Sequence, residues 1–210
     1  MTKSADRRTG GWADRTAVAL LLLLSAYPAI RLSAQDTLPV GFGTLRRDDI
    51  VVRFTTDQLE IQVLPLAQSV IRLLAPDTYR SLADLLKSKD KELRDAARRA
   101  GIDRPTLVMV TFYGLVPRAR FSPEDLNLTS QGQLFRPAAI VPLSPRWSAY
   151  QLEAREQAVA IYLFEGGISF LDGLAVSYRE LTNDSWTSVL PRLERERARV
   201  RARASLQQNP

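Results

Sequence analysis

The feature that most restricts the fold of this chain is a two-residue alternation of apolar and polar side chains, which recurs in short segments. It is clearest in DDIVVRFTTDQLEIQVLPL, where Ile50, Val52 and Phe54 alternate with less apolar neighbours. Successive side chains of a strand point to opposite faces, so this period predicts strands with one buried face. A second alternating run follows residues 56–58, and the pair therefore predicts a β-hairpin.

The period changes to that of a helix between residues 76 and 101. Leu82 and Leu86 share one helical face, and the apolar residues of 93–100 share another. Pro76 suits the start of the first helix, and Gly101 suits the left-handed residue that often follows the end of a helix. We therefore expect an insertion of two helices at about residues 76–101.

Strand-like patterns return after the insertion and continue to about residue 181. TLVMVTFYGL is apolar enough for a central strand, SQGQ is typical of a hairpin turn, and EQAVAIYLFE alternates again. About seven short strands with frequent turn signals predict a mainly β, antiparallel sandwich at residues 35–190. The two-helix insertion interrupts this sandwich, and an arginine-rich helix or tail follows it at residues 191–210.

The N-terminus has the pattern of a secretory signal peptide. Four basic residues, the last of them Arg15, precede an apolar run from residue 17 to about 24, and Pro28 follows. A membrane-spanning helix needs about 20 apolar residues, so the run is too short for a span. We expect residues 1–34 to be removed after Ala34 and the protein to be exported, as a periplasmic or secreted protein. An uncleaved anchor is the alternative.

The chain contains neither cysteine nor histidine. The thiolate and imidazole ligands of common zinc and copper sites are therefore missing, and we expect no metal and no cofactor. Nucleophilic catalysis by serine–histidine or cysteine–histidine pairs is excluded for the same reason. An enzyme built from this chain would have to use carboxylates, lysine, tyrosine or a serine–lysine pair.

The positive charge is concentrated at the two ends of the chain. The whole sequence has 29 basic and 23 acidic residues, and without residues 1–34 it has 24 and 21. When residues 192–203 are also set aside, 18 basic and 19 acidic residues are left. Affinity for nucleic acid comes from neutralising phosphates with a basic surface. A nearly neutral, exported body therefore predicts no nucleic-acid partner.

Two stretches resemble immunoglobulin-like sandwiches of bacterial extracytoplasmic proteins. They are VTFYGLVPRARFSPEDLNLTSQGQLFRP and AVAIYLFEGGISFLDGLAVSYREL, which together cover about half of the chain. The matching positions are Phe121, Pro123, Asp125 and Leu126, with Val176 and Tyr178 near the end. The resemblance implies an immunoglobulin-like fold and an exported protein. The cysteine pair of antibody-type domains is missing, and the helical insertion is additional.

The arginines near the C-terminus are the first candidate binding residues. The candidates are Arg192, Arg195, Arg197, Arg199, Arg201 and Arg203. Trp186 and Leu193 would place one face of this helix against the sandwich, and Pro191 should kink the helix or make it restart. The segment is either a solvated helix or a surface that binds an envelope protein or anionic lipid. We expect no stable membrane span in the processed chain.

Two further groups of residues are candidates for function. The aromatic side chains of Phe121, Phe135, Trp147 and Tyr150 could line a recognition groove or pack in the core. The carboxylates of Glu153, Glu156, Glu165 and Asp172 could serve a hydrolase of envelope polysaccharide, or could lie in turns. The leading hypothesis is an exported, non-catalytic sandwich that binds a protein partner or takes part in envelope assembly. The carboxylate-dependent hydrolase is the alternative.

Overall fold

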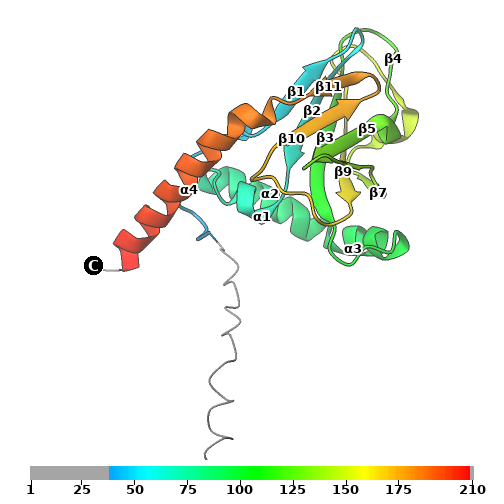
Figure 1. Cartoon of the computed structure of the whole chain (residues 1–210). Coiled ribbons are helices and arrows are strands. Elements are labelled where there is room, and N and C mark those ends of the chain that lie inside the picture. The colour runs from blue at the N-terminus through cyan, green and yellow to red at the C-terminus, as the bar shows by residue number, and fades with distance from the viewer. Residues whose placement is uncertain (1–37, 209–210) are drawn as a thin grey trace, which may run out of the picture. The chain divides into compact units, whose positions relative to one another are not determined.

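The computed structural model describes residues 38–208, so the predicted signal peptide lies outside the described part of the chain. Within these residues eleven strands form antiparallel sheets (Figure 1). The first sheet has the order β1-β2-β3-β9-β7, with bounds Val52–Thr55, Leu59–Pro65, Thr106–Gly114, Gln157–Phe164 and Ala139–Pro142. The second has the order β11-β10-β5-β6, with bounds Leu181–Asn183, Leu174–Tyr178, Leu126–Ser130 and Gln133–Phe135. A third pairs β4 (Ala119–Arg120) with β8 (Gln151–Leu152).

The helices lie in two parts of the chain. Between β2 and β3 come α1, α2 and α3, with bounds Gln68–Ile71, Pro76–Ser88 and Asp90–Arg99, and α4 at the C-terminus spans Trp186–Gln208. Three 3₁₀ turns span Arg47–Asp49, Pro123–Asp125 and Pro145–Ala149. The predicted helix pair is therefore present as α2 and α3, and α1 is a short additional turn. Gly101 follows α3 with a φ of 71°, as the sequence predicts.

The alternating patterns give the first sheet one continuous apolar face. Ile61 in β2 lies opposite Phe112 in β3, which lies opposite Ala158 in β9, and none of the three is exposed. The β1–β2 hairpin and the central position of β3 are as the sequence predicts. The SQGQ hairpin is also present, and Gln131 and Gly132 have φ values of 50° and 77°. Positive φ at both central residues is the geometry that matches the twist of a tight hairpin.

The second sheet packs against this apolar face. Its side chains Leu126, Leu128 and Val176 are fully buried, and Tyr178 is 1% exposed. The rings of Phe112 and Tyr178, one from each sheet, have centroids 5.7 Å apart. Aromatic pairs at this separation add to the stabilisation that comes from burying their area. Two antiparallel sheets that face one another across a shared core fit a β-sandwich.

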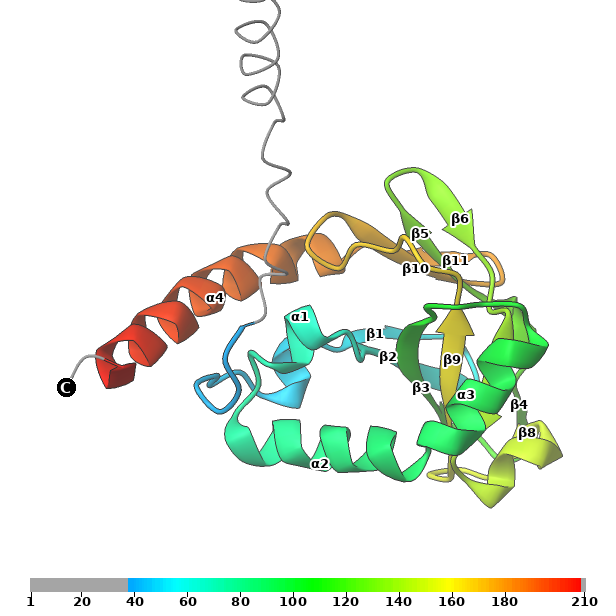
Figure 2. The same ribbon diagram turned by 90° about the horizontal axis from the view of Figure 1, so that it is seen from below.

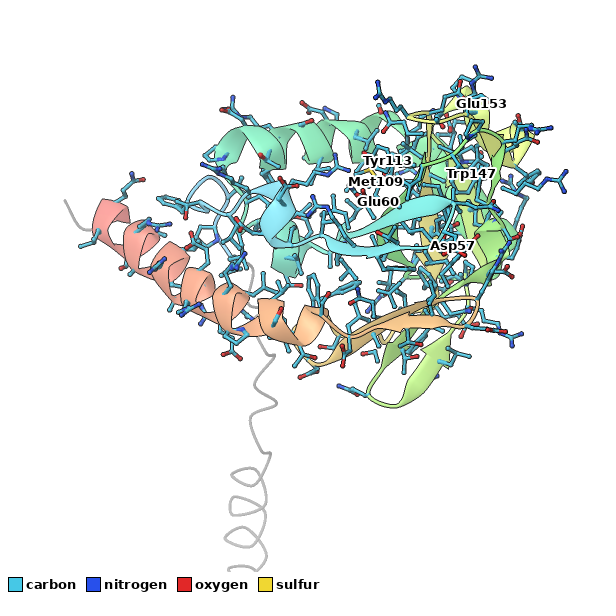
Figure 3. All side chains as sticks on the ribbon, turned by 90° about the horizontal axis from the view of Figure 1, so that it is seen from above. Asp57, Glu60, Met109, Tyr113, Trp147 and Glu153 are labelled. Carbon is cyan, nitrogen blue, oxygen red and sulfur yellow. The ribbon has the colours of Figure 1, made fainter. Side chains whose placement is uncertain are left out.

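The helix pair adds a third layer on the other face of the first sheet (Figure 2). Met109 and Ile161 lie opposite one another on this face and are 5% and 0% exposed, and Met109 is labelled in Figure 3. Leu82 of α2 and Leu93 of α3 are buried in the same core. β3 and β9 are therefore covered on both sides. This double burial explains why their sequences are nearly continuous apolar runs instead of strict alternations.

The C-terminal helix differs from the sequence prediction at Pro191. α4 begins at Trp186 and runs through Pro191 without ending, so of the two predicted outcomes, a kink or a restart, the restart is wrong. Proline removes one backbone hydrogen bond from a helix interior and crowds the preceding turn. Trp186 and Leu193, on either side of the proline, are both fully buried. Because the turns on both sides of Pro191 are packed against the body, the stabilisation from this packing outweighs the tendency of proline to end a helix.

Within residues 38–208, no helix combines the length and the apolar character that a membrane crossing requires.

Candidate binding surface on the C-terminal helix

One side of α4 is fixed to the body by large apolar side chains. Trp186, Leu193 and Val200 repeat every seven residues and are all fully buried. The indole Nε1 of Trp186 donates a hydrogen bond of 3.1 Å to the backbone oxygen of Phe170, and the two rings pack at 6.1 Å. Burying a large side chain stabilises a fold by about 1.5–3 kcal/mol. The helix is therefore docked along its length, and the opposite side faces solvent.

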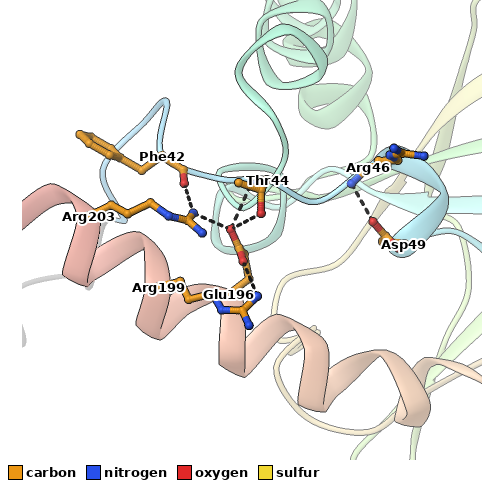
Figure 4. A network of polar contacts seen from close by, with 7 residues as sticks. All are labelled: Phe42, Thr44, Arg46, Asp49, Glu196, Arg199 and Arg203. Carbon is orange, nitrogen blue, oxygen red and sulfur yellow. Dashed lines mark hydrogen bonds and ion pairs between the residues drawn. The ribbon is translucent and has the colours of Figure 1, made fainter.

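A buried carboxylate lies within the docked side of α4 (Figure 4). The side chain of Glu196 is 2% exposed. Its Oε1 accepts hydrogen bonds from the backbone N of Thr44 at 3.0 Å, from the hydroxyl of Thr44 at 2.8 Å and from Arg203 at 2.9 Å. Its Oε2 lies 3.7 Å from the guanidinium of Arg199. A buried charge is tolerated when it is paired and hydrogen-bonded in this way.

Two opposing effects determine the pKa of Glu196, its burial and its hydrogen bonds. Burial alone would raise the pKa of the carboxyl group, because it disfavours the charged form. The hydrogen bonds from Arg203 and Thr44, together with the positive charge of Arg203, outweigh burial and hold the pKa below its ordinary value. Glu196 is therefore ionised at neutral pH.

The carboxylate network fixes the N-terminal segment, defined as residues 38–46, beside α4. Arg203 also donates to the backbone oxygen of Phe42 at 2.5 Å. On its other side the segment forms a parallel bridge in which Leu45 pairs with Leu74. A Cβ atom on Gly43 would come within 2.3 Å of the backbone of Leu73, so only glycine fits there. The segment is thus held between α4 and the chain that follows α1.

The role of Glu196 was not predicted, although the sequence contains a signal for it. Glu196 comes three residues after Leu193 and four before Val200, so it occupies a position of the apolar stripe. An acidic residue at such a position must be paired when the stripe is buried.

The six candidate arginines are divided between two roles. Arg203 and Arg197 are half-buried, and Arg203 serves the Glu196 network. Arg192, Arg195, Arg199 and Arg201 are exposed. Arg192 lies 2.6 Å from the carboxylate of Asp49, and Arg199 is the outer member of the Glu196 network. Exposed ion pairs of this kind contribute little stability, so these cations keep most of their capacity to interact with a partner.

Three of the exposed arginines form a stripe along the outer side of α4. Arg192, Arg195 and Arg199 are followed at helical spacing by Ala202 and Leu206, and all five side chains are exposed. Leu206 is 77% exposed. We call these five residues the basic stripe. Because the other side of α4 is docked, the arginines of the stripe are presented on a rigid helix instead of a mobile tail.

The aromatic candidates divide between the core and the surface. Phe121, Phe135 and Trp147 are 2%, 6% and 5% exposed, whereas Tyr150 is 51% exposed. Phe121 stacks on Phe112 at 4.9 Å and packs against Trp147 at 5.3 Å. Three of the four side chains therefore belong to the core.

The four carboxylate candidates occupy turns and strand ends. Glu156 accepts from the backbone N of Glu153 at 3.0 Å and pairs with Arg146 at 2.8 Å. Asp172 accepts from Gln131 at 2.9 Å, and Glu165 directly follows β9. Figure 3 shows Glu153 far from the C-terminal end of α4. These contacts are those of carboxylates that stabilise turns.

In the part of the chain that the structure describes, no group of three or more acidic side chains could hold a metal ion. Comparisons with protein families, with curated proteins and with solved structures found no match to this chain. The basic stripe is therefore interpreted from its own geometry and charge.

Proposed function

We propose that this protein is an exported, non-catalytic binding module, and that the basic stripe of α4 binds an acidic protein partner in the cell envelope. The observation that carries the proposal is the docking of α4, which presents Arg195 and Arg199 on a fixed helix. A rigid cationic surface loses little conformational entropy on binding. Complementary charge also accelerates encounter and selects against partners of the wrong sign.

The composition of the stripe favours a protein over a lipid bilayer as its partner. Helices that lie in a membrane interface insert large apolar side chains between lipid headgroups. Three of the large apolar side chains of α4, those of Trp186, Leu193 and Val200, are buried in the protein itself. Leu206 is the single large apolar residue of the stripe, and one exposed leucine suits a small pocket on a protein surface.

The export part of the proposal rests on the signal-peptide pattern of residues 1–34. Edman sequencing of the native protein should give a chain that begins at Gln35, and fractionation should place it outside the cytosol. A native chain that retains Met1 and stays in the cytosol would contradict export.

We further propose that the two facing sheets are an immunoglobulin-like sandwich to which helices have been added. The two segments that resemble this family meet in space, because Leu126 pairs with Tyr178 and Leu128 pairs with Val176. The hydroxyl of Tyr178 also accepts a hydrogen bond of 3.0 Å from the backbone N of Ser122.

The hydrolase alternative has less support. A glycosidase needs two facing carboxylates about 5–10 Å apart, one of which has a raised pKa. Glu156 is engaged by Arg146, and Asp172 is engaged by Gln131. No observation on the described residues favours a catalytic pair among them.

The proposal is tested by site-specific photo-crosslinking in intact cells. A crosslinking amino acid at Ala202, an exposed member of the stripe, should capture an acidic envelope protein. The same amino acid at Ala149, exposed on the Pro145–Ala149 turn, is the control. Combining the Ala202 crosslinker with Arg195→Glu and Arg199→Glu should weaken capture about tenfold, because two attractive charges become repulsive.

A second pair of variants controls for net charge. Arg104→Glu and Arg118→Glu change the charge equally at exposed positions away from α4 and should leave capture unchanged. Equal capture from Ala149 and Ala202, or insensitivity to charge reversal in the stripe, would contradict the proposal. Charge-dependent binding to phosphatidylglycerol vesicles, without a protein crosslink, would replace the protein partner with a lipid surface.

A further inference from the structure

The second sheet has an open edge at β6. This strand is the last one of the sheet, and among residues 38–208 no strand pairs with its outer side (Figure 2). The other outer strands of the two larger sheets are covered or interrupted. The side chain of Asn183 in β11 donates to the backbone oxygen of Arg53 in β1 at 2.9 Å, and β7 lies close to α3 and contains Pro142.

The backbone groups that β6 presents at this edge are those of Leu134. The positive φ values of residues 131–132 define a two-residue turn. The residues that flank such a turn, Ser130 and Gln133, form a hydrogen-bonded pair. Hydrogen-bonded and non-hydrogen-bonded pairs alternate in an antiparallel ladder, so Leu134 belongs to a non-hydrogen-bonded pair. The N–H and C=O groups of Leu134 therefore point away from β5.

The side chains of β6 are uncharged, and one of them is a large exposed apolar group. Phe135 is buried, whereas Leu134 is 53% exposed. A concave space of about 340 Å³ lies along the strand, and its lining residues include Pro137 and Glu165. Exposed edges can pair with another chain, and they are usually protected by charges, by proline or by their short length. β6 is short, but it contains neither a charge nor a proline.

The edge is complementary to a second copy of itself. When two β6 strands pair antiparallel about a two-fold axis at Leu134, each Leu134 N–H donates to the Leu134 carbonyl of the other copy, and the two leucine side chains lie side by side. In this register Arg136 faces Gly132 of the partner subunit, so no like charges are opposed. In a parallel pairing the two copies of Arg136 would be neighbours. An unrelated peptide would lack the matching leucine.

The charge balance of the body favours self-association as well. Without residues 1–34 and 192–203 the chain has 18 basic and 19 acidic residues, and a net charge near zero promotes association. We propose that the protein forms a symmetric dimer in which the two β6 strands join the second sheets of both copies into one continuous sheet. The contact uses no residue of the basic stripe, so it goes beyond the proposed function, and each dimer carries two stripes.

Sedimentation velocity tests the dimer on the protein purified in the form that cells produce. The dimer fraction should rise between about 10 µM and about 1 mM, because a short interface gives an affinity in this range. Leu134→Pro removes the outward N–H but no hydrogen bond to β5, so it should keep the circular dichroism of the wild type and stay monomeric. Leu181→Ala, which removes another exposed leucine of the same sheet, should dimerise like the wild type. A wild type that is monomeric at about 1 mM, or a folded Leu134→Pro variant that dimerises, would overturn the proposal.

Single cysteines test the register and do not depend on the proline variant. The chain has no cysteine, so a disulfide in a single-cysteine variant can form only between two copies. In the proposed register the two Cα atoms at position 134 are about 5.5 Å apart, which a disulfide can bridge. Those at position 133 are about 8 Å apart, which is too far.

Under oxidised glutathione, Leu134→Cys should therefore form a covalent dimer about tenfold faster than Gln133→Cys. The two positions are adjacent and both exposed, so accessibility alone does not favour position 134. Equal rates for the two variants would show random collision instead of a defined pairing and would overturn the proposed register and the dimer.

Discussion

Replacing Glu196 with alanine tests whether this carboxylate holds the N-terminal segment against α4. Its side chain is 2% exposed and accepts three hydrogen bonds between 2.8 and 3.0 Å, two from Thr44 and one from Arg203. Breaking a buried ion pair on one side costs about 3–5 kcal/mol. Arg203 is 38% exposed, so water can replace part of the interaction that its guanidinium loses in the variant. We therefore expect the free energy of unfolding to fall by ~2–3 kcal/mol.

Urea unfolding followed by circular dichroism measures this change, and amide exchange locates it. Because Glu196 accepts a hydrogen bond from the backbone N of Thr44, that amide should lose protection in the variant. Glu194→Ala, two residues earlier on an exposed side of the same helix, should change stability by about 0.5 kcal/mol or less. A loss below about 1 kcal/mol in Glu196→Ala, with Thr44 still protected, would refute the assignment of Glu196 as the anchor.

Three other perturbations follow from the same structure. The pKa of Glu196 lies below its ordinary 4.5 in the folded state, so its ionic contribution is complete above that value and is lost as the pH falls through the folded pKa. Unfolding of the wild type and Glu196→Gln, compared from about pH 7 to about pH 3, should therefore converge in acid. Gly43→Ala places a Cβ 2.3 Å from the backbone of Leu73, whereas a Cβ at Gly173 meets nothing within 4 Å. Thermal unfolding of Gly43→Ala should therefore show a loss of stability of about 2 kcal/mol or more. The control Gly173→Ala should unfold like the wild type. Pro191→Ala restores an amide inside α4 and should stabilise the protein by about 1–3 kcal/mol in urea titration; a loss of stability would contradict the interpretation that packing overcomes this proline.

Local pattern was sufficient to predict the elements whose neighbours in sequence are also their neighbours in space. The β1–β2 hairpin and the SQGQ hairpin are of this kind, because alternation and turn residues determine them within a few positions. Gly101 after α3 is another, since a helix end depends on adjacent residues. The arrangement of layers was not predictable in this way. Nothing near Met109 indicates that helices cover its side of the sheet.

The roles of the candidate residues were also not predictable from local pattern, because they depend on contacts with distant parts of the chain. Phe121 and Trp147 are apolar residues in a polar stretch, and only the position of Phe112, from another strand, shows that they are core. One partner of Glu196 is Thr44, which lies in a segment without a strong pattern. The sequence predicted that α4 carries exposed arginines, but the division between docked and exposed arginines depends on contacts that are distant along the chain.

The bond between Thr44 and Glu196 joins positions 152 residues apart. During synthesis the ribosome releases Thr44 long before Glu196, so residues 38–46 can pair with the chain that follows α1 but lack their contacts with α4 until that helix exists. A nascent chain that stops at about residue 190 would contain the strands of both sheets but not the Glu196 carboxylate that fixes residues 38–46 beside α4. The contact between residues 38–46 and α4 can therefore form only after α4 has been synthesised, so it is a late step in folding.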